Sequence, residues 1–349
     1  MSEQLANRFP EVQLAFVGAV DGFERPLIEH SGKLFRSYDQ VQAGPVHGVN
    51  PLRLASSLVK LAIGTVQAFR LLGARKPQVI LSTGGWVGFP VSLAAWLRRV
   101  PVVIYLPDIE PGLTIKGLRW FANRIALTVA ESEKFFPKQQ TVVTGYPLRT
   151  EIMSATRDAA INHFGLDPAR KVLLVFGGSR GARAINIAVG DILGDLLADG
   201  IQVIHVTGTL DWERSQAQAG VLSDHEDYHA YAYLHDDMGL AFAAADLAVC
   251  RAGASILGEF PYFALPSILV PLAYSWRYQQ VNADYLAERG AALHMNEADI
   301  DTELLPALRS LLNDEARLNA MAEAAATLAM GNGAEKLAAL LAQLAQERS

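Results

Sequence analysis

The sequence predicts an α/β protein with two doubly wound domains that face each other across a cleft. Short apolar runs alternate with helical patterns along most of its 349 residues. Glycine-rich turns join a strand to a helix at Gly84, Gly178 and Gly253. The chain is also too long for one ordinary core. We therefore expect one domain at residues 1–147 and a second at 148–349.

The composition narrows the class of protein. Hydrophobic residues make up 51% and charged residues 19%, which is typical of a globular chain. A net charge of −6 provides no basic field, so we expect no nucleic-acid partner. The single cysteine, Cys250, excludes an internal disulfide. The histidines are scattered without the spacing of a metal site, so no metal is expected.

The first domain opens on an apparent helix tail at residues 2–8 and a strand at 12–18. A helical pattern over 52–72 ends at Gly73, and the glycine turn at Gly84 leads into another helix that reaches Arg99. Apolar runs predict further strands at 78–81, 102–105, 126–129 and 141–145. A domain of this kind normally begins with a strand and a glycine-rich loop. Either the domain starts in an unusual way, or both are missing at the start of this chain, as we expect.

The second domain repeats the alternation. Strands are predicted at 172–176, 201–208, 228–234, 247–250, 267–270 and 291–295, with helices between them. The Ala- and Leu-rich tail after Asp299 predicts two or three more helices, with a break at 331–333.

The stretch from Asp246 to Asn282 is the most informative for function. An apolar strand stops at Arg251 and Gly253, and a helix follows, so free backbone N–H groups favour an anion there. Glu259 lies one helical turn after Ser255 and could bind vicinal hydroxyls. A glycine that merely permits the turn is an equally good interpretation.

A second glycine turn, residues 177–181, opens the helix after the strand at 172–176 and could hold a diphosphate. It lacks the Gly-x-x-x-x-Gly-Lys pattern of ATPases. The alternative is a packing turn, but two such turns in one half of the chain favour a nucleotide. Arg149, at the domain junction, could reach a diphosphate, or it could be a surface arginine.

Two stretches of the first half, residues 96–99 and 116–124, mix aromatic and basic side chains. Proteins that face anionic lipid use this combination. Tryptophans packed in a core, with arginines reaching outward, are the alternative.

These motifs resemble those of the MurG-type GT-B glycosyltransferases, which have two Rossmann-like domains. In the second half the resemblance rests on residues 175–183, on 250–254 with Glu259, and on Gln279 and Gln280 with Asn282. Residues 145–150 are similar to the interdomain segment of that family, and 236–238 to the helix start before its donor site. Residues 84–90 and 112–114 extend the resemblance to the first half.

The resemblance implies an inverting transferase without a metal or other cofactor. It would move N-acetylglucosamine from UDP-GlcNAc to undecaprenyl-diphosphate-muramoyl-pentapeptide, turning lipid I into lipid II in peptidoglycan synthesis. The first domain would face the acceptor and the membrane, and the second would bind the UDP-sugar. The protein would then be a cytoplasmic, peripheral enzyme at the inner face of the cell membrane.

Carried over by position, the resemblance also implies a donor site. Its residues would be Arg149, Gly178, Ser179 and Gly181 at the diphosphate; Arg251, Gly253, Ala254 and Ser255 in the phosphate turn; Glu259 at the ribose; His235, through its backbone, at the uracil; and Gln279 and Gln280 at the sugar.

The chain departs from the family pattern at the acceptor side. The candidate base of the family lies in the opening loop that we expect to be missing here. Its His-Glu-Gln-Asn segment is replaced by residues 105–108, which leaves Asp108 as a substitute candidate. Two alternatives follow. One is another UDP-sugar enzyme on the same fold, with a different lipid acceptor or with 2-epimerase activity. The other is a UDP-sugar-binding half that is inactive without a partner or its N-terminus.

Overall fold

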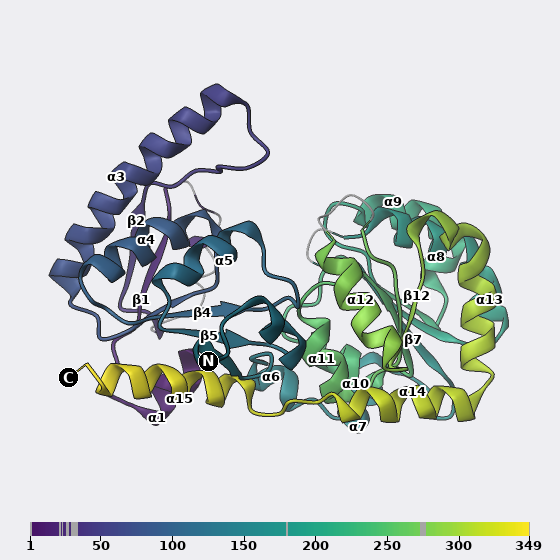
Figure 1. The fold of residues 1–349 in the computed structure, drawn as a ribbon. Helices are drawn as coiled ribbons and strands as arrows, with labels where there is room; N and C mark the ends of the chain where they lie inside the picture. The colour runs from purple at the N-terminus through teal and green to yellow at the C-terminus, as the bar shows by residue number, and fades with distance from the viewer. Residues whose placement is uncertain are drawn as a thin grey trace. The chain divides into compact units, whose positions relative to one another are not determined.

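The computed structural model describes residues 2–20, 22, 24, 25, 28, 34–178, 181–272 and 277–348. The chain forms two compact units (Figure 1). Unit 1 comprises residues 1–147 and 332–349, and unit 2 comprises residues 148–331. The sequence placed residues 332–349 with the second domain, whereas the structure places them in unit 1.

Unit 2 is built on a six-stranded parallel sheet. Its strands are β7 (Val172–Phe176), β8 (Gln202–Val206), β9 (Tyr228–Tyr231), β10 (Leu247–Cys250), β11 (Ser267–Leu269) and β12 (Ala292–His294). Their order in the sheet is β12-β11-β10-β7-β8-β9. The chain therefore winds outward from β7 to β9, and then returns to β10 on the other side of β7. The switch point of this doubly wound sheet lies between β7 and β10.

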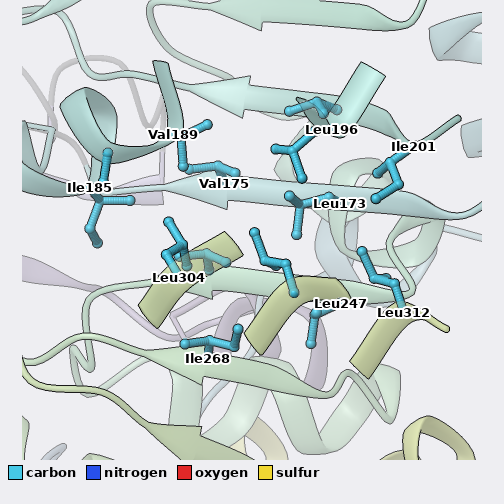
Figure 2. Packing of buried hydrophobic residues seen from close by; sticks show 14 of the residues in the cluster. Leu173, Val175, Ile185, Val189, Leu196, Ile201, Leu247, Ile268, Leu304 and Leu312 are labelled. Carbon is cyan, nitrogen blue, oxygen red and sulfur yellow. The ribbon is translucent and has the colours of Figure 1, made fainter. Parts of the chain in front are cut away.

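Helices of unit 2 alternate with these strands. They are α6 (Thr150–Met153), α7 (Arg157–Phe164), α8 (Arg183–Ala198), α9 (Trp212–Ala219), η5 (Gly220–Asp224), α10 (Met238–Ala244), α11 (Ile256–Phe263), α12 (Tyr278–Glu288), η6 (Glu297–Asp299), α13 (Ile300–Leu312) and α14 (Glu315–Thr327). Figure 2 shows Leu173 and Val175 of β7 packed among apolar side chains of α8 and α13. Because helices cover the sheet, its strands are almost continuously apolar.

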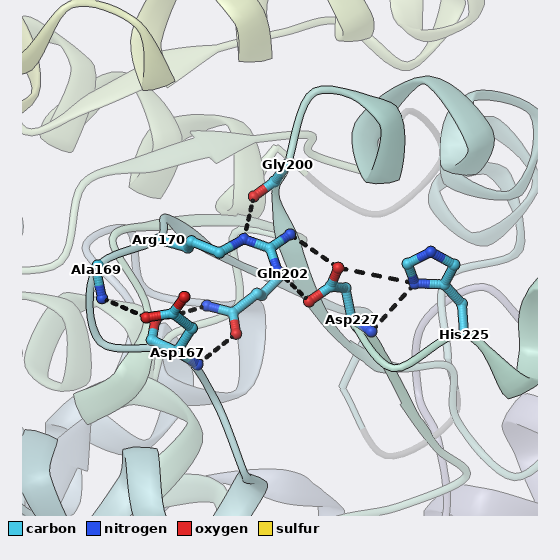
Figure 3. A network of polar contacts seen from close by, with 7 residues as sticks. All are labelled: Asp167, Ala169, Arg170, Gly200, Gln202, His225 and Asp227. Atoms are coloured by element: carbon cyan, nitrogen blue, oxygen red, sulfur yellow. Dashed lines mark hydrogen bonds and ion pairs between the residues drawn. The ribbon is translucent and has the colours of Figure 1, made fainter.

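A polar cluster closes the sheet of unit 2 at the amino ends of its strands. Arg170 makes two hydrogen bonds of 2.7 and 2.8 Å to the Asp227 carboxylate, and its Nε donates to the carbonyl of Gly200 (Figure 3). Gln202 and Asp167 exchange hydrogen bonds beside it. These residues precede β7, β8 and β9 or begin them, so the cluster ties these strands together at the edge opposite the switch-point loops.

Unit 1 contains two smaller parallel sheets. β1 (Ala15–Ala19) pairs with β2 (Ser37–Val41), and β3 (Ile80–Ser82), β4 (Val102–Leu106), β5 (Arg124–Leu127) and β6 (Thr141–Val143) follow one another in sequence order. Its described helices are α1 (Ser2–Arg8), α3 (Pro51–Arg75), α4 (Gly85–Leu97), α5 (Leu113–Leu118), η2 (Arg119–Phe121), η3 (Ala130–Phe135), η4 (Lys138–Gln140) and α15 (Gly333–Gln346).

Alternate residues of β4 belong to different cores, which explains where α15 lies. Val102 and Ile104 pack in a cluster with residues of α3, α4 and α5. Val103 and Tyr105 pack instead with Leu5 of α1 and with five residues of α15 (Leu337, Ala338, Leu340, Leu341 and Leu344). Since adjacent strand residues point to opposite faces, α15 covers one face of the unit 1 sheet.

Helix α3 is longer than its sequence pattern predicts. Asn50 caps its amino end by accepting a hydrogen bond from the Arg53 N–H at 2.8 Å. Gly73 does not end it, because the helix continues to Arg75 and Lys76 takes the left-handed capping conformation, with φ of 48°. By length and apolar composition, α3 is the one helix in the described parts of the chain that could cross a membrane.

Candidate functional site

The strongest candidate site in unit 2 lies at the switch point of its sheet. β7 and β10 are hydrogen-bonded neighbours, with Phe176 opposite Cys250 at their carboxyl ends. The chain leaves β7 through residues 177–182 and leaves β10 through residues 251–255, and each loop leads into a helix. Ligands of open parallel sheets bind at such a point, where the two loops diverge. The two glycine turns singled out in the sequence are these two loops.

The first loop depends on its glycines. Gly178 and Gly181 both have φ of 81°, a conformation that side chains rarely adopt. A Cβ on Gly181 would also collide with the carbonyl oxygen of Thr207. α8 follows with Ala182 at its N-cap, which offers no side-chain acceptor to the N–H groups of the first turn. An anion could bind there. Ser179 lies outside the described residues, so its predicted contact with the diphosphate stays a prediction.

In the second loop, Gly253 lacks the positive φ of Gly178 and Gly181. Its φ is not in the left-handed region, and an added Cβ would meet no heavy atom within 4 Å among the described residues beyond its chain neighbours. The turn therefore does not need a glycine at this position, and the predicted phosphate contact of Gly253 stays a prediction. Gly253 instead leaves open space. Ala254 and Ser255, which follow it, donate their backbone N–H groups to no acceptor in the described parts of the chain.

Glu259, Ser255 and Arg149 come together in unit 2. Burial raises the pKa of the Glu259 carboxyl, while a hydrogen bond to Ser255 and the positive charge of Arg149 oppose that shift. Ser255 is the N-cap of α11, and its side chain caps no N–H of that helix. Arg149 is the N-cap residue of α6. The arrangement is a half-buried carboxylate within electrostatic reach of a guanidinium, at the start of the helix that follows β10.

Arg251 has a supporting position. Its Nη1 donates to the carbonyl of Val270 at 3.0 Å, and its Nη2 forms an ion pair with Glu297 of η6. The guanidinium therefore joins the ends of β10 and β11 to η6. Its side chain is only 12% exposed, and its positive charge is paired with Glu297 inside the unit.

The remaining predicted donor residues lie on the segments after β9 and β11. His235 is exposed and stacks edge-on against Tyr233, with ring centroids 4.6 Å apart. Gln279, on the first turn of α12, accepts a hydrogen bond from the Leu272 N–H at 3.0 Å. Gln280 is exposed. Among the described residues, none of these three side chains forms a hydrogen bond or ring contact with the glycine loops.

Two buried asparagines support these loops, and the sequence predicted no role for either. Asn282 of α12 donates to the carbonyl of Ala252 at 3.1 Å and so holds the second loop. Asn186 of α8 donates to the carbonyl of Thr207 at 2.8 Å, beside the first loop. Each is an amide among apolar positions of a helix, and this signal could have identified both.

Asp108 belongs to unit 1, where it follows the carboxyl end of β4. It is half-buried, as is Glu110. Burial raises the pKa of the neighbouring Tyr105 hydroxyl, and the negative charge of Asp108 adds slightly to this shift. Among the residues that the structure describes, no group of three or more His, Cys, Asp or Glu side chains could hold a metal ion.

Comparisons with known proteins agree with this architecture. Residues 1–127 match the glycosyltransferase family 28 N-terminal domain, and residues 172–339 match the family 28 C-terminal domain. The chain is 41% identical to a UDP-N-acetylglucosamine–N-acetylmuramyl-(pentapeptide) pyrophosphoryl-undecaprenol N-acetylglucosamine transferase of Roseiflexus sp. (strain RS-1), over 95% of this chain and 84% of that protein.

A relative with the same description from Halalkalibacterium halodurans is 34% identical over 98% of this chain and 94% of its own length. Among solved structures, Acinetobacter baumannii MurG superposes with a TM-score of 0.75 at 23% identity. The superposition covers 98% of this chain and 95% of that chain. At 23% identity, this structural match supports the same fold and nothing beyond it.

Proposed function

Because this chain belongs to the MurG family of glycosyltransferases, we propose that it transfers N-acetylglucosamine from UDP-GlcNAc to the lipid-linked muramoyl-pentapeptide. The observation that carries the donor half of this proposal is the pair of loops at the β7/β10 switch point. They present an uncapped helix start, open space at Gly253 and a half-buried carboxylate within one unit.

The diphosphate of the donor would bind to the backbone N–H groups of Ala254 and Ser255 and to the start of α8, with Ser179 and Gly178 in the same loop. Arg149 would add a positive charge beside it. Glu259 would accept hydrogen bonds from the ribose hydroxyls, since a carboxylate offers acceptors only. His235 would contribute its backbone to the uracil, and Gln279 and Gln280 would bind the sugar hydroxyls. Arg251 would act as a support of the loop.

The chemical step would be a direct displacement. The acceptor oxygen forms a bond to the sugar C1, and the bond from C1 to the phosphate oxygen breaks, so that UDP leaves with the electron pair. The proton of the acceptor hydroxyl passes to a base, for which Asp108 is the candidate. Backbone dipoles and Arg149 would stabilise the charge that develops on UDP, so the residues themselves could do this without a metal.

Calorimetric titration with UDP, UDP-GlcNAc and UDP-glucose tests the donor site. We expect Glu259→Ala to weaken UDP-GlcNAc binding by roughly 10- to 100-fold, the cost of losing a charged hydrogen-bonding group. Glu323→Gln, at an exposed position of α14, is the matched control and should bind as the wild type does. Folded wild-type protein that binds none of the three nucleotides would refute the assignment.

The products separate this proposal from the alternatives. Incubation with UDP-GlcNAc and the lipid-linked acceptor should release UDP and glycosylate the lipid. A 2-epimerase would isomerise the sugar nucleotide without any acceptor, and a binding module would bind UDP-GlcNAc and leave it unchanged.

We further propose that unit 1 docks on anionic lipid at the inner face of the cell membrane, through an exposed face of α3. Six of its large apolar residues are exposed (Leu52, Leu58, Val59, Ile63, Val66 and Phe69). They share one side of the helix at helical spacing, next to the stripe that α3 buries. Only 22% of its most apolar window is buried, whereas the core helix of a soluble protein would be mostly covered.

Cations and tryptophans adjoin this face and support the same proposal. Arg98, at the end of α4, lies over the Phe69 ring at 3.9 Å. Trp96 packs near Phe121 of η2, and the neighbouring Trp120 is 73% exposed with Arg119 beside it. The first aromatic-basic stretch therefore adjoins α3, and the second adjoins the first. Arginine with interfacial tryptophan suits an anionic headgroup layer.

Co-sedimentation with vesicles tests the membrane proposal. Val59→Glu places a charge on the exposed apolar face and should reduce binding to phosphatidylglycerol vesicles. Gln139→Glu adds the same charge to an exposed position of η4, outside α3, and should change binding much less. Equal losses would point to net charge alone and would exclude docking through this face.

A further inference from the structure

A chain of buried polar groups runs through the core of unit 2 beneath the first glycine loop. His205 is the fourth of the five residues of β8 and is 1% exposed. Its Nδ1 lies 3.0 Å from the Tyr228 hydroxyl, and its Nε2 lies 3.0 Å from Oδ1 of Asn186. Asn186 is buried in the first turn of α8.

The direction of each hydrogen bond follows from its partners. Oδ1 of Asn186 can only accept, so the Nε2 of His205 carries the proton and the Nδ1 accepts from the Tyr228 hydroxyl. Nδ2 of Asn186 then donates to the carbonyl of Thr207 at 2.8 Å. Burial lowers the pKa of His205 to about 4, which keeps the ring in this neutral form at neutral pH.

The far end of the chain of bonds reaches the candidate site. The Thr207 carbonyl that Asn186 binds is the same group that Gly181 lies against. Asp211, 3.5 Å from Nδ2 of Asn186, also accepts a hydrogen bond from Nε of Arg183 at 3.0 Å. Gly181 and Arg183 thus both contact groups that are hydrogen-bonded to Asn186. Asn186 is in turn hydrogen-bonded to His205.

Apolar side chains would fill this space at lower cost, because each buried polar group must find its partner. The neighbouring strand positions on the sheet are apolar, Val203 and Ile204 among them. Packing alone therefore does not explain why a chain of polar side chains ends under the first loop.

We propose that Tyr228, His205 and Asn186 form a positioning chain that holds Gly181 and the first turn of α8 in place to receive the diphosphate of the donor. The role in donor binding rests on the proposed function. The positioning itself does not, because it concerns the protein without ligand.

Two breaking variants, one rescue and one matched control test this inference. His205→Leu and Asn186→Ala each interrupt the chain, and either can replace the other if one fails to fold. His205→Gln keeps an amide donor near the Nε2 position. Asp227→Asn weakens the cluster at the amino ends of the strands (Figure 3) and lowers stability. Asp227 directly precedes Tyr228, but its side chain makes no hydrogen bond to Tyr228, His205 or Asn186.

The first measurement is amide hydrogen exchange of residues 181–187 in the free protein. We expect about tenfold faster exchange in the breaking variants, from the loss of a buried hydrogen bond. His205→Gln should restore slow exchange. Asp227→Asn should leave the exchange rate of residues 181–187 unchanged when each protein is measured at the same number of degrees below its own melting temperature.

The second measurement is UDP affinity by calorimetry, which should fall about tenfold in the breaking variants and recover in His205→Gln. If the breaking variants and Asp227→Asn behave alike in both measurements, the chain is merely structural and the inference is wrong. If wild-type protein binds no UDP, the donor site fails, and hydrogen exchange still decides the positioning role.

Discussion

Gly253 lies in a backbone conformation that any residue can adopt, with open space where a side chain would project. We therefore expect Gly253→Ala to keep the melting temperature within a degree or two, since a surface change of this kind costs about 0.5 kcal/mol or less. Its methyl group would occupy the space proposed for the donor phosphate, so UDP affinity should fall at least tenfold, about 1.4 kcal/mol.

Gly181→Ala is the contrasting variant, because it meets the Thr207 carbonyl and has φ of 81°. It should lower the melting temperature as well as the UDP affinity. Calorimetry and thermal denaturation of the two variants together check the prediction. Unchanged UDP affinity in Gly253→Ala would mean that the space above this residue stays empty.

His205 makes a second prediction at the residue scale. Its pKa in the fold is about 4, below the ordinary value of about 6.5, so the unfolded chain takes up a proton that the folded chain refuses. The fold therefore loses stability as the pH falls from about 6.5 towards 4, by about 3 kcal/mol in total from this group. Thermal denaturation between pH 4 and 7 should show a shallower decline for His205→Gln than for the wild type. Parallel curves would contradict this.

At the scale of elements, the Arg170–Asp227 pair joins the amino ends of three strands. The carboxylate of Asp227 is 10% exposed and accepts two short hydrogen bonds from the guanidinium. We expect Asp227→Asn to lower the free energy of unfolding of unit 2 by about 1–3 kcal/mol, the cost of weakening a charged bond at a part-buried site. Urea denaturation followed by tryptophan fluorescence, Trp212 being in this unit, measures the loss. Arg317→Gln, at an exposed position of α14, is the control.

Helix α3 has two neighbouring apolar stripes, one buried and one exposed. Its buried stripe, which includes Leu61, Ala68 and Leu72, packs into unit 1, while the neighbouring stripe stays exposed. The sequence pattern gave the helix but not this division. An apolar helix of this length is consistent with a core position until its neighbours are known.

At the scale of the whole molecule, the chain returns to its first unit through α15. Four leucines of this helix are buried in unit 1 (Leu337, Leu340, Leu341 and Leu344). At about 1.5–3 kcal/mol each, they contribute as much as the net stability of a typical domain. Removal of residues 332–349 should therefore unfold unit 1 and leave unit 2 folded.

Calorimetric scanning and limited proteolysis of the truncated chain check this prediction. One thermal transition should disappear, and a protease-resistant fragment close to residues 148–331 should remain. If both transitions survive, α15 is dispensable for unit 1.

The class of fold and the loops of the candidate donor site could be predicted from local patterns in the chain. β7 and β10 begin and end where their apolar runs do, and the glycine turns follow them, because period, turn chemistry and helix starts are local properties of the chain. The resemblance through residues 175–183 and 250–254 pointed to the family that the comparisons then showed.

Which distant groups come into contact became known from the folded structure. Arg149 reaches the surroundings of Glu259 across more than a hundred residues, and α15 packs with α1 from the other end of the chain. His205 and Asn186 belong to no motif in the sequence. They join one chain of hydrogen bonds only when β8 and α8 pack together. Contacts between distant residues depend on burial and on the order of strands in a sheet, which no local pattern encodes.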